Sequence, residues 1–113
     1  MHELGIVYEV IKVVDSFVEE NQLMTVEKIV LEVGQLSQAI PRFIEACYPA
    51  AVDGTKYELT QLEILVVEAK GACKICGEIY NIIDHRKICP NCHNASFTLV
   101  SGEEFNIKEV VAC

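Results

Sequence analysis

Two cysteine pairs, Cys73-Lys74-Ile75-Cys76 and Cys89-Pro90-Asn91-Cys92, decide how this chain is organised. Two residues between the cysteines of a pair let both sulfurs reach one ion, and two such pairs complete a tetrahedral shell of four sulfurs. The intervening residues 77–88 are suited to a hairpin that brings the pairs face to face. Gly77 can adopt the positive φ that such a turn needs. The spacing therefore predicts one zinc site with Cys73, Cys76, Cys89 and Cys92 as ligands.

A shell filled by four cysteines leaves no position for water or substrate, so we interpret the zinc as structural. Iron binding, sensing and dithiol redox chemistry remain as alternatives, although a redox site needs only one pair, usually at a helix start. Three disulfides would need an oxidising compartment. Because the sequence begins without a basic leader and an apolar stretch, we expect a cytoplasmic protein in which the cysteines bind metal.

Two histidines accompany the cysteines. His93 follows Cys92 directly, so its position beside the metal makes it a candidate modulator of the zinc site or a replacement for one thiolate. His85 lies in the middle of the hairpin, where a solvated loop residue is the simpler interpretation. Cys47 is expected to be a small buried apolar residue and Cys113 a free thiol, and neither is given a function.

The zinc segment interrupts a larger unit, because residues 73–92 contain too few large aliphatic side chains to form a core of their own. The flanking sequence predicts a helix over 4–21 and a second helix from Pro41 that Pro49 ends or kinks. Strands are expected at 26–33, 62–67 and 105–111, and the run 62–67 reads as covered on both faces. We therefore expect an α+β fold, a small three-stranded sheet with two helices plus an inserted zinc-ribbon-like subdomain. The predicted boundaries are 1–69 with 101–113 for the α/β domain and 70–100 for the zinc domain.

The charge of the chain limits its partners. Seventeen acidic and nine basic residues give a formal net charge of -8. Nucleic-acid binding needs clustered lysine and arginine, and the basic residues here are scattered. No apolar run approaches the roughly 18 residues that cross a bilayer. We expect neither a nucleic-acid nor a membrane partner.

The first three residues offer a second set of metal donors. The α-amine of Met1, the amide and imidazole nitrogens of His2 and the carboxylate of Glu3 are contiguous. Nitrogen-rich planar sets of this kind suit Ni(II) or Cu(II). An ordinary helix start, in which Glu3 complements the helix dipole, is the alternative.

Three features together resemble the HypA/HybF hydrogenase maturation family. They are Met1-His2-Glu3-Leu4, the segment Leu31-Glu32-Val33-Gly34-Gln35-Leu36-Ser37, and the two cysteine pairs followed by a strand-like C-terminal segment. The resemblance spans nearly the whole chain. It implies a nickel metallochaperone, not an enzyme, that supplies Ni(II) to the large subunit of a [NiFe] hydrogenase with the GTPase HypB.

Carried over residue by residue, the resemblance assigns Met1, His2 and Glu3 to nickel and the four paired cysteines to zinc. Two departures limit it. Ile40-Pro41 stands where some members have an acidic residue near the nickel, and Glu78 stands where some have a histidine after the first cysteine pair. A zinc-ribbon adaptor that docks through its sheet edge or first helix, or a nucleic-acid module without nickel function, remains the alternative. We expect a monomer or a weak homodimer.

Overall fold

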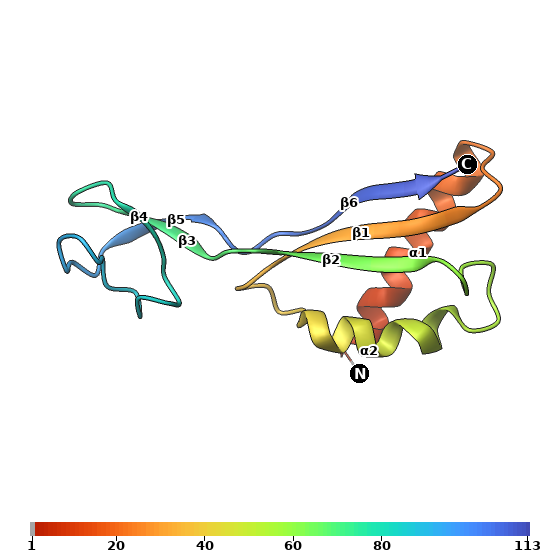
Figure 1. Cartoon of the computed structure of the whole chain (residues 1–113), viewed down its shortest axis with the longest axis horizontal. Coiled ribbons are helices and arrows are strands. Elements are labelled where there is room, and N and C mark those ends of the chain that lie inside the picture. Colours follow the sequence, from red (N-terminus) through yellow and green to blue (C-terminus); the bar gives the residue numbers. More distant parts are fainter. Residues whose placement is uncertain (1) are drawn as a thin grey trace.

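Two three-stranded sheets at opposite ends of an elongated molecule form the frame of the structure, a computed structural model that describes residues 2–113 and the side chains from Glu3 onward (Figure 1). The principal extents are 54 × 28 × 16 Å and the radius of gyration is 17.7 Å. A compact domain of this length would have a radius of gyration of about 13 Å. The chain therefore folds as two modules in line.

The first module contains both helices and the larger sheet. Its elements are α1 (His2–Glu20), β1 (Val26–Gly34), α2 (Pro41–Val52), β2 (Gln61–Val67) and β6 (Phe105–Ala112). The second module contains β3 (Lys70–Cys73), β4 (Ile79–Asn81) and β5 (Phe97–Ser101). The expected α+β fold with an inserted cysteine-rich subdomain is confirmed, because β3, β4 and β5 lie between β2 and β6 in the chain.

The order of the first sheet is β2-β1-β6, so the three strands expected from the sequence do share one sheet. β1 pairs in parallel with β2, from Lys28 opposite Gln61 to Gly34 opposite Val67. It pairs in antiparallel fashion with β6. A parallel pair needs a crossover connection, and α2 supplies it.

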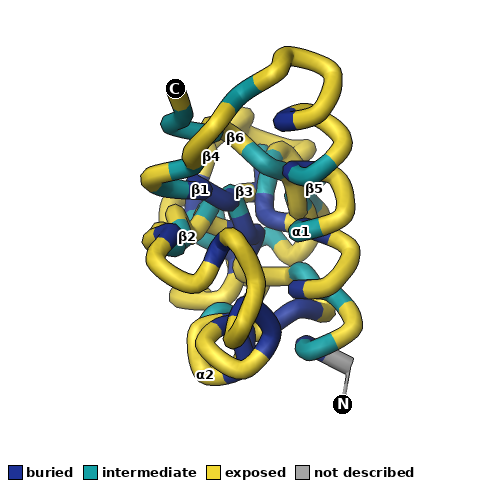
Figure 2. Tube along the Cα trace, turned by 90° about the vertical axis from the view of Figure 1, so that its right-hand side faces the viewer, coloured by how far each residue is buried: buried dark blue, intermediate teal, exposed yellow. Residues whose placement is uncertain are grey.

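One face of this sheet forms the main core with the two helices. Alternate residues of β1 are almost completely buried, and they belong to one core with an apolar stripe on α1 and buried residues of α2. Figure 2 colours the buried positions along the chain dark blue. The core residues from these three elements are Val7, Val10, Val14, Val18, Ile29, Leu31, Val33, Ile44, Cys47, Tyr48, Ala51 and Val52. Cys47 is thus a buried core residue, as expected.

The prediction that residues 62–67 are covered on both faces is wrong. β2 is an edge strand, and Leu65 and Val66 are 37% and 54% exposed. Helices cover only one face of the sheet, where Leu62 and Ile64 pack against the core, whereas Leu65 and Val66 remain largely open to solvent.

Pro49 does not end α2, which continues to Val52. Proline removes one amide donor and releases the carbonyl of the residue four positions earlier, Glu45. Glu45 and Pro49 are both exposed, so water can bond to that carbonyl. The buried Ala51 and Val52 retain the last turn because they pack into the core.

The two modules join where backbone segments pass very close to one another. Gly34 donates its amide hydrogen to the Glu104 carbonyl at 2.7 Å, and Leu36 donates to the Gly102 carbonyl at 2.7 Å. Gly102 has φ 122°, and a Cβ there would lie 2.6 Å from the Ala69 Cα. A Cβ on Gly34 would overlap the carbonyl oxygen of Gly102. Both positions therefore require glycine.

We predict that Gly34→Ala lowers the free energy of unfolding by about 2 to 3 kcal/mol, because the new methyl group forces backbone apart at the junction. Gly5→Ala is the matched control. A Cβ at Gly5 meets nothing within 4 Å, and alanine is the better helix former, so stability should rise by up to about 1 kcal/mol. Urea denaturation of the three proteins checks both signs, and equal stability of Gly34→Ala and the native chain would contradict the packing described.

Candidate metal centre

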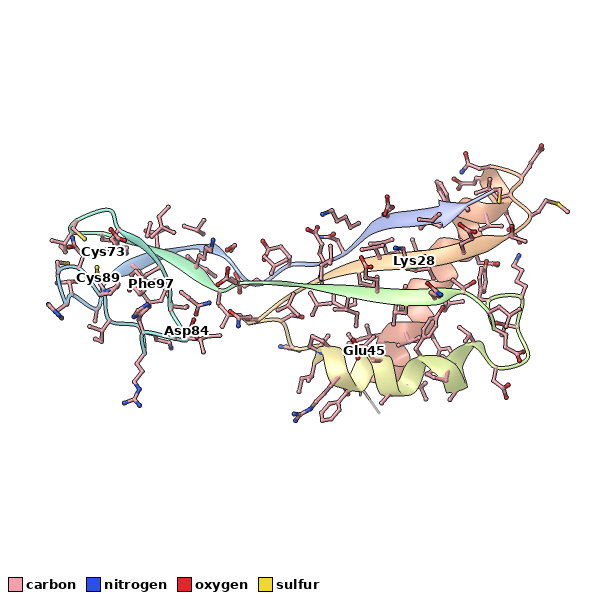
Figure 3. All side chains as sticks on the ribbon, viewed as in Figure 1. Lys28, Glu45, Cys73, Asp84, Cys89 and Phe97 are labelled. Atoms are coloured by element: carbon pink, nitrogen blue, oxygen red, sulfur yellow. The ribbon has the colours of Figure 1, made fainter. Side chains whose placement is uncertain are left out.

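The four paired cysteines converge at the outer end of the second module. Cys73 is the last residue of β3, and Cys76 lies in the turn that follows. Cys89 and Cys92 lie in the connection between β4 and β5. All four sulfur atoms lie within 4.8 Å of one another, and Figure 3 shows Cys73 and Cys89 together at the tip of the module.

The sulfur positions fit a tetrahedral metal shell. The Sγ atoms of Cys73 and Cys92 are 3.5 Å apart, and those of Cys76 and Cys89 are 3.6 Å apart. A zinc ion with four Zn–S bonds of about 2.3 Å holds its sulfurs about 3.8 Å from one another. These two distances are within about 0.3 Å of that spacing, and the most widely separated sulfurs are within about 1 Å of it, so the cluster has the size of a four-sulfur zinc shell.

Both cysteine pairs have the same backbone geometry. The first cysteine of each pair donates its amide hydrogen to the residue five positions later, Cys73 to Glu78 at 2.8 Å and Cys89 to Asn94 at 2.9 Å. The residue after each pair bonds back to the first cysteine at 2.9 Å and has a positive φ, 80° for Gly77 and 64° for His93. The expectation for Gly77 is confirmed.

The pKa values of three cysteine thiols are shifted, and the shifts differ in direction. The side chain of Asn91, followed by the Glu78 amide, lowers the pKa of Cys76 to about 6. The amide of Cys76 is the main cause that lowers the pKa of Cys73. The Asn94 amide lowers the pKa of Cys92, but hydrogen bonds from the other thiols and burial together raise it to about 12. One thiol thus retains its proton until a cation offsets the charge of its neighbours.

Burial separates the ligands into an inner and an outer set. Cys73 and Cys89 are buried, Cys92 is partly buried and Cys76 is exposed. The six cysteines, all within the described part of the chain, form no disulfide. The site therefore combines reduced thiols with a short path to solvent for an entering ion.

The two histidines near the cysteines lie outside the sulfur cluster. His93 is exposed, and its left-handed backbone is part of the second turn. His85 is also exposed, and its ring meets the edge of Tyr80 with the centroids 6.0 Å apart. Among the described residues, the group that can surround one ion contains the four cysteines alone. A role for His93 as modulator stays a prediction.

The predicted nickel ligands are the first three residues of the sequence, and α1 begins at the second of them. Met1 and the side chain of His2 lie outside the described residues. Glu3 is in the first turn of α1 and is only 9% exposed. The first turn of α2, which begins at Pro41, carries no acidic residue, as the departure from the family pattern implied.

Sequence reasoning missed the polar residues that support the cysteines. Asn91 acts on Cys76 through its side chain, and its place between two cysteines was the only available signal. The left-handed conformation of His93 was also missed. Glycine at position 77, after the first cysteine pair, indicates a positive φ, whereas histidine after the second pair does not.

A family model described as hydrogenase/urease nickel incorporation, metallochaperone, HypA, matches residues 1–112. The hydrogenase maturation factor HypA of Geobacter sulfurreducens is 32% identical over 110 residues, which cover 97% of each chain. That of Nostoc punctiforme is 36% identical over 111 residues, covering 97% of this chain and 94% of the relative.

Two solved structures share the fold. The nickel metallochaperone HypA of Helicobacter pylori is similar with a TM-score of 0.65 and 18% identity, covering 97% of this chain and 96% of that one. A second HypA structure has a TM-score of 0.69 and 20% identity, covering 100% and 97%.

Removal of metal with a strong chelator at neutral pH is predicted to unfold residues 70–101 and to leave the first module folded. The second module has a buried core of only Ala69, Cys73, Tyr80, Ile82 and Cys89, two of them cluster cysteines. Amide NMR spectra should lose the dispersed signals of β3–β5 and retain those of α1 and β1, and added Zn²⁺ should restore them. Dispersed β3–β5 signals in protein shown by elemental analysis to be metal-free would refute this dependence.

Proposed function

Because the chain belongs to the HypA family of hydrogenase and urease nickel-incorporation metallochaperones, we propose that it carries Ni(II) at the start of α1 and delivers it for [NiFe] hydrogenase maturation. In this proposal the four cysteines hold a resident zinc ion. The observation that carries the zinc assignment is the cluster of four sulfurs within 4.8 Å of one another. When bound, zinc would supply only structural cross-linking, since the protein fills all four positions.

The proposed nickel ligands are the Met1 amine, the His2 amide and imidazole nitrogens and the Glu3 carboxylate. The first four N–H groups of a helix have no intrahelical partner, so the His2 amide nitrogen can bind metal without breaking a bond of α1. Nitrogen-rich sets of this kind suit Ni(II). Capture and release then require no unfolding of the first module.

The charge distribution supports a cation carrier. Residues 70–100 contain four lysines or arginines and two acidic residues, which leaves five basic and fifteen acidic residues for the rest of the chain. A strongly negative module raises the local concentration of a divalent cation and speeds its capture. Four thiolates around one Zn²⁺ would cancel the small positive charge of the zinc module, which disfavours a nucleic-acid role.

We propose the domain boundaries that the sequence predicted. Residues 1–69 and 101–113 form the nickel domain, and residues 70–100 form the zinc domain. The proposed partners are the GTPase HypB and the hydrogenase large subunit, and no catalytic role is proposed. Delivery is placed in the cytoplasm, where thiols stay reduced for zinc. Within residues 2–113, no helix combines the length and the apolar run needed to cross a bilayer.

Calorimetric titration of tag-free, zinc-loaded protein with Ni²⁺ is predicted to show one site per chain. His2→Ala and an added N-terminal residue should each weaken binding by at least about 100-fold, because loss of a direct ligand costs more than the 10- to 100-fold of an outer-shell change.

His85→Ala is the matched control and should bind nickel like the native chain. If the native chain binds no nickel, a zinc adaptor without nickel function is the better interpretation. If both N-terminal variants bind as tightly as the native chain, the nickel site lies elsewhere.

A further inference from the structure

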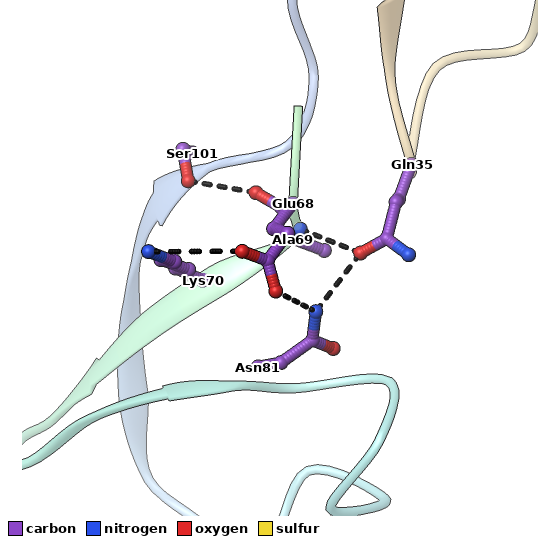
Figure 4. Close-up of polar contacts among 6 residues, drawn as sticks. All are labelled: Gln35, Glu68, Ala69, Lys70, Asn81 and Ser101. Atoms are coloured by element: carbon purple, nitrogen blue, oxygen red, sulfur yellow. Dashed lines mark hydrogen bonds and ion pairs between the residues drawn. The ribbon is translucent and has the colours of Figure 1, made fainter. Parts of the chain in front are cut away.

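The amide side chain of Gln35 lies where the two modules meet. Two segments of the chain connect the second module to the first, and we call them the crossings. One lies between β2 and β3, and the other lies between β5 and β6. Gln35 belongs to the loop after β1, in the first module. Its Oε1 accepts one hydrogen bond from the Ala69 amide at 2.8 Å and another from the Asn81 Nδ2 at 3.0 Å (Figure 4).

Within the described part of the chain, the Asn81–Gln35 bond is the one side-chain hydrogen bond that links the Gly34–Leu36 loop to a strand of the second sheet. Glu68, between β2 and β3, makes a second and longer side-chain contact with Asn81 at 3.4 Å. The other junction bonds of the Gly34–Leu36 loop are made by backbone amides, to Val67, Gly102 and Glu104. Those backbone bonds end on Val67, the last residue of β2, and on Gly102 and Glu104 between β5 and β6, so they hold the base of the second module rather than its strands.

Asn81 is itself fixed by the hairpin that leads to the second cysteine pair. Its Oδ1 accepts hydrogen bonds from the Ile83 amide at 2.9 Å and the Asp84 amide at 3.0 Å. An asparagine that bonds to its own backbone two and three residues later forms a tight turn. The Asn81 side chain therefore links two parts of the chain. Its oxygen holds the turn of the hairpin that leads to the second cysteine pair, and its nitrogen donates to Gln35 in the first module.

Glu68, between β2 and β3, contacts both the end of β5 and Asn81. The Ser101 hydroxyl donates to the Glu68 carbonyl at 2.8 Å, and the Asn81 Nδ2 also approaches the Glu68 carboxylate at 3.4 Å. The Lys70 ammonium lies 3.9 Å from the same carboxylate. The polar groups at the junction thus form one connected network rather than isolated contacts.

We propose that Gln35 and Asn81 form a clamp that sets the orientation of the zinc module relative to the nickel module. The pair joins the two modules into one rigid body. A partner then meets the proposed nickel site of the first module and the cysteine cluster of the second in a fixed geometry. Loss of the clamp leaves each module folded and lets the second pivot about the two crossings. The proposal concerns orientation alone and does not depend on nickel binding.

The test measures module orientation by NMR in the full-length, zinc-loaded chain without nickel. Residual dipolar couplings and ¹⁵N relaxation are recorded for the native protein and for Gln35→Ala. Gln38→Ala is the matched control, because Gln38 is exposed in the same loop and makes none of these contacts. The native protein and the control should fit one alignment tensor, whereas Gln35→Ala should need two tensors that differ in magnitude.

Asn81→Asp provides a second variant that separates the clamp from folding. An aspartate keeps the oxygen that accepts from Ile83 and Asp84, but it removes the donor to Gln35 and places a charge beside Glu68. Cysteine Cβ shifts should stay at native values while the common tensor is lost. A single tensor in both variants, or two tensors already present in the native protein, would overturn the proposal.

Discussion

Four sulfur atoms within 4.8 Å of one another place the strongest constraint on this chain. They cannot all carry negative charge unless a cation lies among them, and the raised pKa of Cys92 expresses that constraint in the metal-free chain. The fold of the second module depends on how this charge is balanced, because its buried core contains only five residues and two of them are cysteines of the cluster. A tetrahedral ion bound by the four sulfurs would replace the apolar interior that such a short segment cannot supply.

The first module has no such dependence. Its core joins α1, α2 and one face of the sheet, and β1 is almost fully buried at its centre. The cysteine cluster thus lies in one module of a molecule 54 Å long, and α1 has its own apolar support in the other module. Glycines at the junction allow the crossings to pass close together, and the Gln35 side chain reaches across them.

The sequence predicted most of the fold because its signals were local. Helical periodicity placed α1, β-branched runs placed β1 and β6, and the cysteine spacing located the metal cluster before any geometry was known. The wrong prediction for β2 came from tertiary context, since the sheet has helices on one face only. Of the two outcomes predicted for Pro49, the end of the helix does not occur, because the last turn of α2 is buried in the core. The Gln35–Asn81 contact joins residues 46 positions apart and follows no short-range pattern, so only the structure could reveal it.

X-ray absorption at the zinc and nickel edges of one doubly loaded sample tests the two-site account most directly. The account predicts four sulfur neighbours at about 2.3 Å around zinc. Around nickel it predicts nitrogen and oxygen neighbours alone, because the proposed terminal ligands contain no coordinating sulfur. Sulfur neighbours at the nickel edge would place nickel in the cysteine cluster, and nitrogen neighbours at the zinc edge would replace a cysteine ligand with a histidine. The first result would contradict the assignment of the two metals to separate sites, and the second would contradict the four-cysteine zinc site.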